Sequence, residues 1–151
     1  MSEIFIERLS EKTLSGAAKL ERLCFSSPWS RESLALLCGE GAVGFAAIDK
    51  ESGDVLAYGG MLTVLDEGQI TNIATHPDAR RQGLGERVTR ALVEYGENNG
   101  ISFFSLEVRE SNFAAIALYE KLGFKKAGIR KNFYKLPVEN AVIMIKETET
   151  V

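Results

Sequence analysis

The sequence has few of the residues on which metal, redox or disulfide chemistry depends. Its 151 residues include one histidine and two cysteines, and the spacing of Cys24 and Cys38 matches no metal-binding or redox motif. We therefore expect no metal cofactor and interpret both cysteines as small buried thiols in a reducing cytoplasm. The single histidine, His76, precedes Pro77, which indicates a turn residue rather than a catalytic base.

Long apolar runs and an excess of basic charge are also missing. No run approaches the roughly 18 apolar residues that suggest a membrane span. The first residues include Glu3, Glu7 and Glu11 and lack the basic-then-apolar layout of a signal peptide. The net charge is −3 and the pI about 5.3, so no general attraction to nucleic acid or anionic membranes is expected. We predict a cytoplasmic protein that contacts neither nucleic acid nor membranes directly.

What the sequence does contain is enough apolar material for one core. It is 45% hydrophobic and 26% charged, which is ordinary for a globular domain. Its three prolines are scattered, and no linker, repeat or low-complexity stretch divides the chain. We therefore expect one domain over residues 1–151.

The apolar periodicity alternates between strand-like and helix-like along the chain. Ser30 is expected to cap the second helix, and Gly59-Gly60 to mark a bulge or a close backbone approach. Antiparallel strands followed by a strand-helix-strand-helix middle predict an α/β (α+β) domain, with a mixed sheet of about seven strands and about four helices. The predicted elements are strands over 4–6, 41–48, 55–65, 69–75, 102–108, 125–130 and 141–146, and helices over 11–25, 31–38, 84–99 and 112–122.

A basic turn with two glycines lies between the strand over 69–75 and the helix that begins at 84. It reads RRQGLG, from Arg80 to Gly85. The glycines let the backbone approach a ligand, and the free amides and dipole of the following helix favour an anion such as a pyrophosphate. The sequence has neither the Gly-Lys-Ser/Thr of a P-loop nor the full dinucleotide fingerprint. Taken alone, such a turn more often only caps a helix.

A carboxylate stands in the apolar strand over 102–108. Leu106 and Val108 face one way in an extended chain, so Ser105 and Glu107 face the other. A carboxylate in such a position is a candidate general base. The alternative is a charge at a strand end in contact with water.

Two polar side chains lie two turns apart on the helix that follows. Asn112 and Tyr119 therefore share a face, with Ala115 between them. A narrow polar stripe with a small residue at its centre suits a thin ligand. The alternative is an ordinary half-buried tyrosine on an amphipathic helix.

In order and spacing, these motifs resemble the GNAT superfamily of N-acetyltransferases. The stretches that match are Arg80-x-x-Gly83-x-Gly85, Glu107-Val108-Arg109, and Asn112-x-x-Ala115-x-x-Leu118-Tyr119-x-x-x-Gly123-Phe124. Four further stretches resemble the RimI-type protein N-terminal alanine acetyltransferases: Glu21 to Ser30 with its Pro28-Trp29-Ser30, Asn72 to Pro77, Leu106 to Asn112, and Arg130-x-x-Phe133-Tyr134.

Two departures fall in the region that helps form the acceptor pocket of that family. Phe133 stands where the family usually has tyrosine. The loop over 135–140 is shorter than usual and ends in Asn140, where aspartate is common.

The resemblance implies a GNAT-like fold, acetyl-CoA as co-substrate and an amine as acceptor. It assigns Glu107 as general base and Tyr119 as general acid, and it places Trp29 and Tyr134 beside the acceptor. The cofactor-binding residues that it implies are Ile73, Ala74 and Thr75 for the acetyl and pantetheine groups, Asn112 for the pantetheine, and the backbone of Arg80, Arg81, Gln82, Gly83, Leu84, Gly85 and Glu86 for the pyrophosphate.

The acceptor that the resemblance implies is the N-terminal peptide of a protein, beginning with alanine, from a small-subunit ribosomal protein. An α-amine titrates at roughly 7.7–8.0 and a lysine at about 10.4, so at neutral pH the α-amine is neutral several hundred times more often, a difference of about 3.5 kcal/mol. A single glutamate is therefore better matched to a chain N-terminus.

Two alternatives stay open. The first is a GNAT enzyme that acts on a small-molecule amine or a lysine side chain. The second is a non-enzymatic CoA-binding regulatory module, against which the presence of both Glu107 and Tyr119 argues, since a sensor needs neither.

Overall fold

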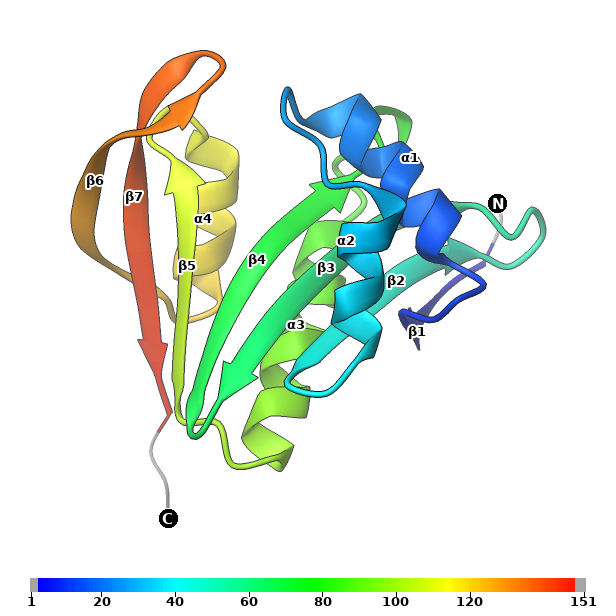
Figure 1. The fold of residues 1–151 in the computed structure, drawn as a ribbon, viewed down its shortest axis with the longest axis horizontal. Helices are drawn as coiled ribbons and strands as arrows, with labels where there is room; N and C mark the ends of the chain where they lie inside the picture. The colour runs from blue at the N-terminus through cyan, green and yellow to red at the C-terminus, as the bar shows by residue number, and fades with distance from the viewer. Residues whose placement is uncertain (1–2, 149–151) are drawn as a thin grey trace.

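The computed structural model describes residues 3–148, in which a single seven-stranded sheet is covered by helices on both faces (Figure 1). This confirms the predicted mixed sheet of seven strands with four α-helices. The elements are β1 (Ile4–Arg8), α1 (Leu14–Cys24), α2 (Arg31–Ala35), β2 (Ala42–Asp49), β3 (Val55–Val64), β4 (Glu67–Thr75), α3 (Leu84–Asn98), β5 (Phe103–Arg109), α4 (Phe113–Lys121), β6 (Lys125–Lys135) and β7 (Val138–Glu147), with the short 3₁₀ helices η1 (Leu36–Cys38) and η2 (Pro77–Ala79).

The strand order is β1-β2-β3-β4-β5-β7-β6, and within residues 3–148 β4 and β5 are the one parallel pair among neighbours. A parallel pair needs a crossover connection, and α3 supplies it between these two strands. An N-terminal group of four strands and a C-terminal group of three thus meet in the sheet at β4 and β5.

The pairing of β4 with β5 is short. It covers Glu67–Gln69 on β4 and Phe103–Ser105 on β5, and the two strands diverge beyond it (Figure 1). From Ile70 onward β4 is paired with β3 alone. The second half of β4 therefore has main-chain groups that face β5 without a strand partner.

A bulge in β4 lies where the two strands part. β3 has one residue, Gly60, where β4 has two, Thr71 and Asn72. A bulge of this kind turns consecutive side chains toward one face of the sheet. A Cβ atom on Gly60 would lie 2.5 Å from Leu37 Cδ1, so both the bulge and the close approach predicted at Gly59-Gly60 are confirmed.

Each face of the sheet has its own apolar core. On one face α3 and α4 pack against the sheet through Leu92, Phe104, Ile116, Tyr119 and Phe124. On the opposite face, α1 and α2 form a second cluster with β2, β3 and β4. Its largest members are Leu14, Leu20, Leu34, Leu37 and Tyr58.

The last hairpin differs from its prediction. β6 continues to Lys135 and β7 begins at Val138, so most of the loop predicted over 135–140 is strand, and the turn is only Leu136-Pro137. β6 is an edge strand with nearly every residue exposed. Such a strand lacks the apolar alternation from which strands are predicted.

Two smaller predictions were also wrong, and one was right. Asn112 is not inside α4 but caps it, and its side-chain oxygen accepts the N–H of Ala115 at 3.2 Å. Cys38 is exposed and Cys24 only partly buried, because both stand at helix ends near the surface. The predicted Ser30 cap is confirmed, since its hydroxyl accepts the Ser33 N–H at 3.1 Å.

Residues 3–148 include no helix that is long and apolar enough to cross a membrane. In the same part of the chain, no three or more histidine, cysteine or acidic side chains gather in a way that could hold a metal ion.

Candidate active site

The turn before α3 has the geometry of an anion site. Gly83 is the N-cap of α3 in the left-handed region (φ 72°), and Arg81 also has a positive φ of 69°. The Arg87 N–H bonds the Gly83 carbonyl at 3.0 Å. The N–H groups of Leu84–Glu86 precede this bond and have no helical carbonyl to bind. With the positive end of the helix dipole, they favour a negatively charged ligand.

The end of β4 lies beside this turn. A Cβ atom on Gly85 would lie 3.4 Å from Thr75 Oγ1, so strand and helix start are nearly in contact. The Thr75 carbonyl accepts a weak hydrogen bond from Cys24 Sγ at 3.3 Å. Ile73, Ala74 and Thr75, which were predicted to contact the cofactor, thus lie on the strand that leads into the turn.

Glu107 lies on β5 with the orientation predicted for it. Leu106 and Val108 are buried in the α3–α4 core, so Glu107 points to the opposite face. Its side chain is 17% exposed, and one carboxylate oxygen lies 3.4 Å from Nη1 of Arg130 on β6. Glu107 is therefore a largely shielded carboxylate held by one arginine.

Tyr119 is buried at the end of α4, with its ring edge-on to Phe124 at 6.0 Å. Burial raises the pKa of Tyr119, and nearby Tyr134 raises it further. Its hydroxyl forms no hydrogen bond within residues 3–148. The phenol therefore stays protonated across the physiological range, with its donor free for a ligand.

Tyr134 connects the two predicted catalytic residues. Burial raises the pKa of Tyr134 to about 12, the Glu107 carboxylate adds to the rise, and Arg109 opposes it. Tyr134 on β6 is therefore within electrostatic range of both Glu107 on β5 and Tyr119 on α4. These three residues lie up to 27 positions apart in the sequence.

Arg109 organises the hairpin that carries Tyr134. Its guanidinium lies 4.3 Å from the centre of the Tyr134 ring and 3.1 Å from a carboxylate oxygen of Glu139. It also donates to the carbonyls of Leu136 at 3.3 Å and Pro137 at 3.0 Å. In the sequence, Arg109 is one residue of the Glu107-Val108-Arg109 motif and has no role of its own implied by the resemblance. Nothing in the sequence indicated that its partners are main-chain carbonyls 27 and 28 residues away.

Glu21, the first residue of the matched stretch over 21–30, has no role implied by the resemblance and is a buried carboxylate in the structure. It lies in the last turn of α1 with none of its surface exposed, and it accepts hydrogen bonds from the Trp29 N–H at 2.8 Å, from Asn72 Nδ2 at 3.1 Å and from the Tyr58 hydroxyl. Burial raises the pKa of Glu21, and the three hydrogen bonds partly offset the rise. Trp29 itself is half-buried against the α1–α2 core.

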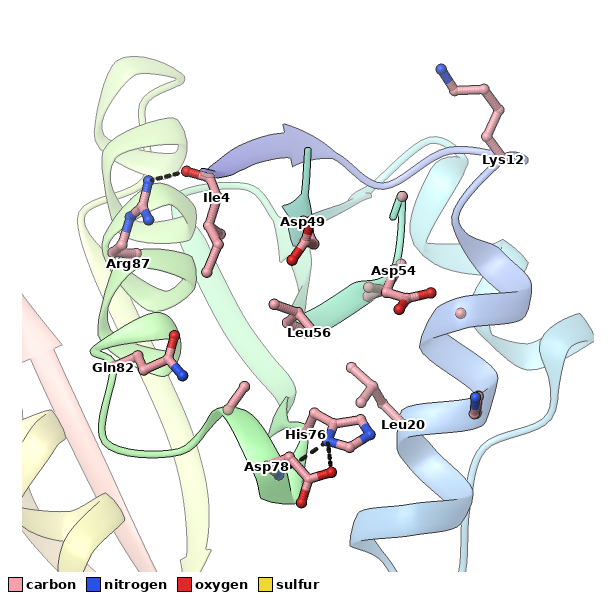
Figure 2. Close-up of a pocket in the computed structure, with 15 residues that line it drawn as sticks. Ile4, Lys12, Leu20, Asp49, Asp54, Leu56, His76, Asp78, Gln82 and Arg87 are labelled. Atoms are coloured by element: carbon pink, nitrogen blue, oxygen red, sulfur yellow. Dashed lines mark hydrogen bonds and ion pairs between the residues drawn. The ribbon is translucent and has the colours of Figure 1, made fainter. Parts of the chain in front are cut away.

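A cavity of about 1030 Å³ adjoins the start of α3 (Figure 2). α1, η2 and the turn between β2 and β3 complete its walls. Charged residues of both signs line it, including Lys12, Arg87, Asp54 and Asp78. Gln82 is the one predicted site residue among those that line it. Glu107, Tyr119 and Asn112 lie elsewhere, so this cavity is not the place of the predicted chemistry.

Comparison with known proteins finds a family model and several similar enzymes. Residues 14–124 match the family model described as the acetyltransferase (GNAT) family. The [ribosomal protein bS18]-alanine N-acetyltransferase of Escherichia coli K12 is 40% identical over 141 residues, which cover 92% of this chain and 94% of that protein. A putative enzyme of the same description from Bacillus subtilis is 39% identical over 126 residues, 83% of each chain.

Solved structures give the same result. The crystal structure of the ribosomal-protein-S18-alanine N-acetyltransferase from Escherichia coli superposes with a TM-score of 0.88 at 37% identity, covering 99% of this chain and 96% of that one. A chain of the NatC complex bound to Gag peptide and CoA shares the fold, with a TM-score of 0.85 at 21% identity over 97% of this chain and 99% of that one.

Proposed function

This chain belongs to the acetyltransferase (GNAT) family, and on that premise we propose that it acetylates the N-terminal α-amine of a protein, with the N-terminal alanine of ribosomal protein bS18 as acceptor. The observation that carries the chemistry is the shielded carboxylate of Glu107 on β5, the strand that separates from β4, with Tyr134 in electrostatic range of both Glu107 and Tyr119. Relatives at about 40% identity that are named for this acceptor support its identity.

Acetyl-CoA supplies the acetyl group as a thioester and would lie along the second half of β4. The unpaired main chain of Ile73, Ala74 and Thr75 would bind the acetyl carbonyl and the pantetheine amides, as an added strand does. The amides of residues 81–86 would hold the pyrophosphate at the start of α3. Asn112, exposed at the start of α4, would contact the pantetheine from the other side.

The acceptor amine must lose a proton before it can attack the thioester. Glu107 takes that proton, directly or through one water, and the amine lone pair then forms the new C–N bond. As the C–S bond breaks, the sulfur leaves with the bonding pair and Tyr119 donates its hydroxyl proton to it. The new amide nitrogen still carries one surplus proton, which passes to the Tyr119 phenolate, so the products are a neutral amide and a free thiol. Burial raises the pKa of Tyr119, so the phenol carries its proton when the reaction begins.

The acceptor peptide would enter between the segment over 25–30 and the β6–β7 hairpin. Trp29 lies on the first side and Tyr134 on the second. The Ser26 hydroxyl donates to the Leu136 carbonyl, which connects the two sides. A small first side chain, such as that of an N-terminal alanine, would let the amine approach between these two segments.

The proposed acceptor is tested by mass spectrometry of three substrates incubated with acetyl-CoA. The first is a peptide with the N-terminal residues of bS18 from the organism that encodes this chain. The second is the same peptide with a blocked N-terminus and an added lysine, and the third is a set of small amines. We expect a gain of one acetyl group on the first peptide alone, and this gain should fall strongly in Glu107→Gln.

The matched control is Glu110→Gln, which removes an exposed carboxylate three residues further along. It should retain wild-type turnover. Equal acetylation of the lysine in the blocked peptide would instead assign the enzyme to side-chain or small-amine acceptors.

A further inference from the structure

We propose that Glu21 is a positioning residue for the acceptor. Its buried carboxylate fixes the segment over 25–30 against β4 and so sets the path of the acceptor amine toward the acetyl group. This inference rests on the proposed acetyl transfer and adds to it a residue that neither binds a substrate nor moves a proton.

The first observation is that Glu21 is buried without a cation. Its side chain is wholly enclosed, and none of the ion pairs within residues 3–148 includes it. Removing a carboxylate from water is costly, and an apolar side chain of similar volume in its place is often neutral or stabilising. Stability of the fold is therefore a poor reason for a glutamate here.

The second observation is that Glu21 holds both ends of the segment over 25–30. Its main-chain carbonyl accepts the Phe25 N–H at 2.9 Å, and its carboxylate accepts the Trp29 N–H at 2.8 Å. The segment between has no regular structure, and Pro28 has no N–H to offer. The carboxylate thus fixes the far end of a segment that the backbone alone would leave loose.

The third observation is that the same carboxylate reaches β4. Its second oxygen accepts Asn72 Nδ2 at 3.1 Å, and Asn72 belongs to the bulge directly before Ile73. Tyr58 on β3 completes the network by donating its hydroxyl to Glu21. One side chain therefore joins the proposed acceptor segment to the strand proposed for the acetyl group.

Carboxylate chemistry suits this position because all three partners are donors. An amide N–H, a phenol and an Asn amide converge on two oxygens, and an ionised carboxylate is an acceptor only. Glutamine has nearly the same shape but one acceptor oxygen, so it can hold part of the network. Leucine fills similar space and holds none of it.

The test compares wild type with Glu21→Gln and Glu21→Leu in steady-state kinetics, with peptide and acetyl-CoA varied separately. We expect the peptide KM to rise about tenfold or more in Glu21→Leu and by less in Glu21→Gln, since a lost hydrogen bond to a charged group is worth about that factor. The KM for acetyl-CoA should stay unchanged. The control is Thr13→Val, which removes a buried hydroxyl at the other end of α1 and should alter neither constant.

A second measurement follows the conformation of the segment over 25–30 without any catalytic reaction. Trp29 is the one tryptophan of the chain, so its fluorescence reports this segment alone. Acrylamide should quench it more strongly in Glu21→Leu than in wild type, with Glu21→Gln between them and Thr13→Val at the wild-type value.

Two results would overturn the inference. One is an equal rise of both KM values, which would mean a general loss of structure. The other is unchanged Trp29 quenching in both Glu21 variants. If the wild type acetylates no N-terminal peptide, it is the proposed function that fails, and the quenching experiment still decides whether Glu21 holds the segment. Should Glu21→Leu not fold, Glu21→Gln alone must show the split between the KM values.

Discussion

Gly83→Ala is the most direct probe of the proposed pyrophosphate site. Gly83 caps α3 with φ 72° and ψ 17°, and a Cβ atom there would meet nothing within 4 Å. The substitution therefore causes no clash, and its cost is the left-handed backbone, about 1–2 kcal/mol for an L-residue. If the turn relaxes to escape this strain, the amides of Leu84–Glu86 turn away from the anion. Such a loss corresponds to about 5–30-fold in an equilibrium constant.

A matched control exists at the other end of the same helix. Gly100 follows α3, has φ 84°, and likewise has nothing within 4 Å of a built Cβ. Gly100→Ala should therefore cost the same conformational energy. For a chain of this length each 1 kcal/mol lowers the Tm by about 2–4 °C. Both variants should show this loss, which makes their stabilities directly comparable.

Isothermal titration calorimetry of each variant with acetyl-CoA separates the loss of stability caused by backbone strain from a loss of acetyl-CoA affinity. We expect the dissociation constant to rise about 5–30-fold in Gly83→Ala and to stay at the wild-type value in Gly100→Ala. The reasoning is refuted if Gly83→Ala loses stability but binds acetyl-CoA like the wild type. It is equally refuted if both variants lose affinity together.

Three further predictions concern the ionisable groups. Tyr119→Phe should lower kcat about 10²–10⁴-fold while acetyl-CoA affinity is retained. The control Tyr95→Phe on α3 should leave kcat unchanged. If Tyr119→Phe has the wild-type kcat when chemistry limits the rate, the general acid is another group. Glu107→Gln should lower activity most at neutral pH and less above about pH 8, where the α-amine deprotonates unaided; a defect independent of pH would indicate a positioning role. The pKa of Glu21 is raised in the folded state. Above pH 4.5 the unfolded chain therefore loses the Glu21 proton before the folded protein does, and the free energy of unfolding falls until the pH passes the folded-state pKa. In urea titrations, Glu21→Gln should therefore gain stability relative to wild type as the pH rises above 4.5, and a constant difference would contradict the raised pKa.

The sequence predicted most of the fold because most elements bury one face. α3 and β5 repeat apolar residues with the period of their element, and both form close to where they were predicted. The prediction failed for the β6–β7 hairpin, where β6 is exposed on both faces and has no such period. It also placed Asn112 inside α4, because helical spacing does not distinguish an N-cap from the first turn.

The candidate site was predictable only where its residues stand in local motifs. Glu107 and Tyr119 each belong to a short pattern on one element, and the turn at Gly83 could be read from its glycines. Glu21 and Arg109 could not be found this way, since what distinguishes them is their partners. Glu21 contacts a residue 51 positions away, and Arg109 contacts carbonyls across the hairpin. These contacts exist because the sheet order brings distant residues together, and no local sequence pattern predicts that order.

The sheet order also bears on the choice of acceptor. Three residue pairs join β4 to β5, and beyond this short junction the two strands diverge, with the proposed acetyl-binding residues on β4 and the proposed base on β5. Beyond it, Glu21 holds the segment over 25–30 on the β4 side, and Arg109 holds the β6–β7 hairpin on the β5 side. Because Ser26 contacts Leu136 between them, an acceptor must pass two segments that already meet.

A chain terminus brings its amine at the end of a single strand, whereas a lysine carries peptide on both sides of its attachment point. We therefore expect that opening this contact with Ser26→Ala will accelerate lysine acetylation more than N-terminal acetylation in a competition of the two peptides. An equal effect on both peptides would remove this contact as a source of selectivity.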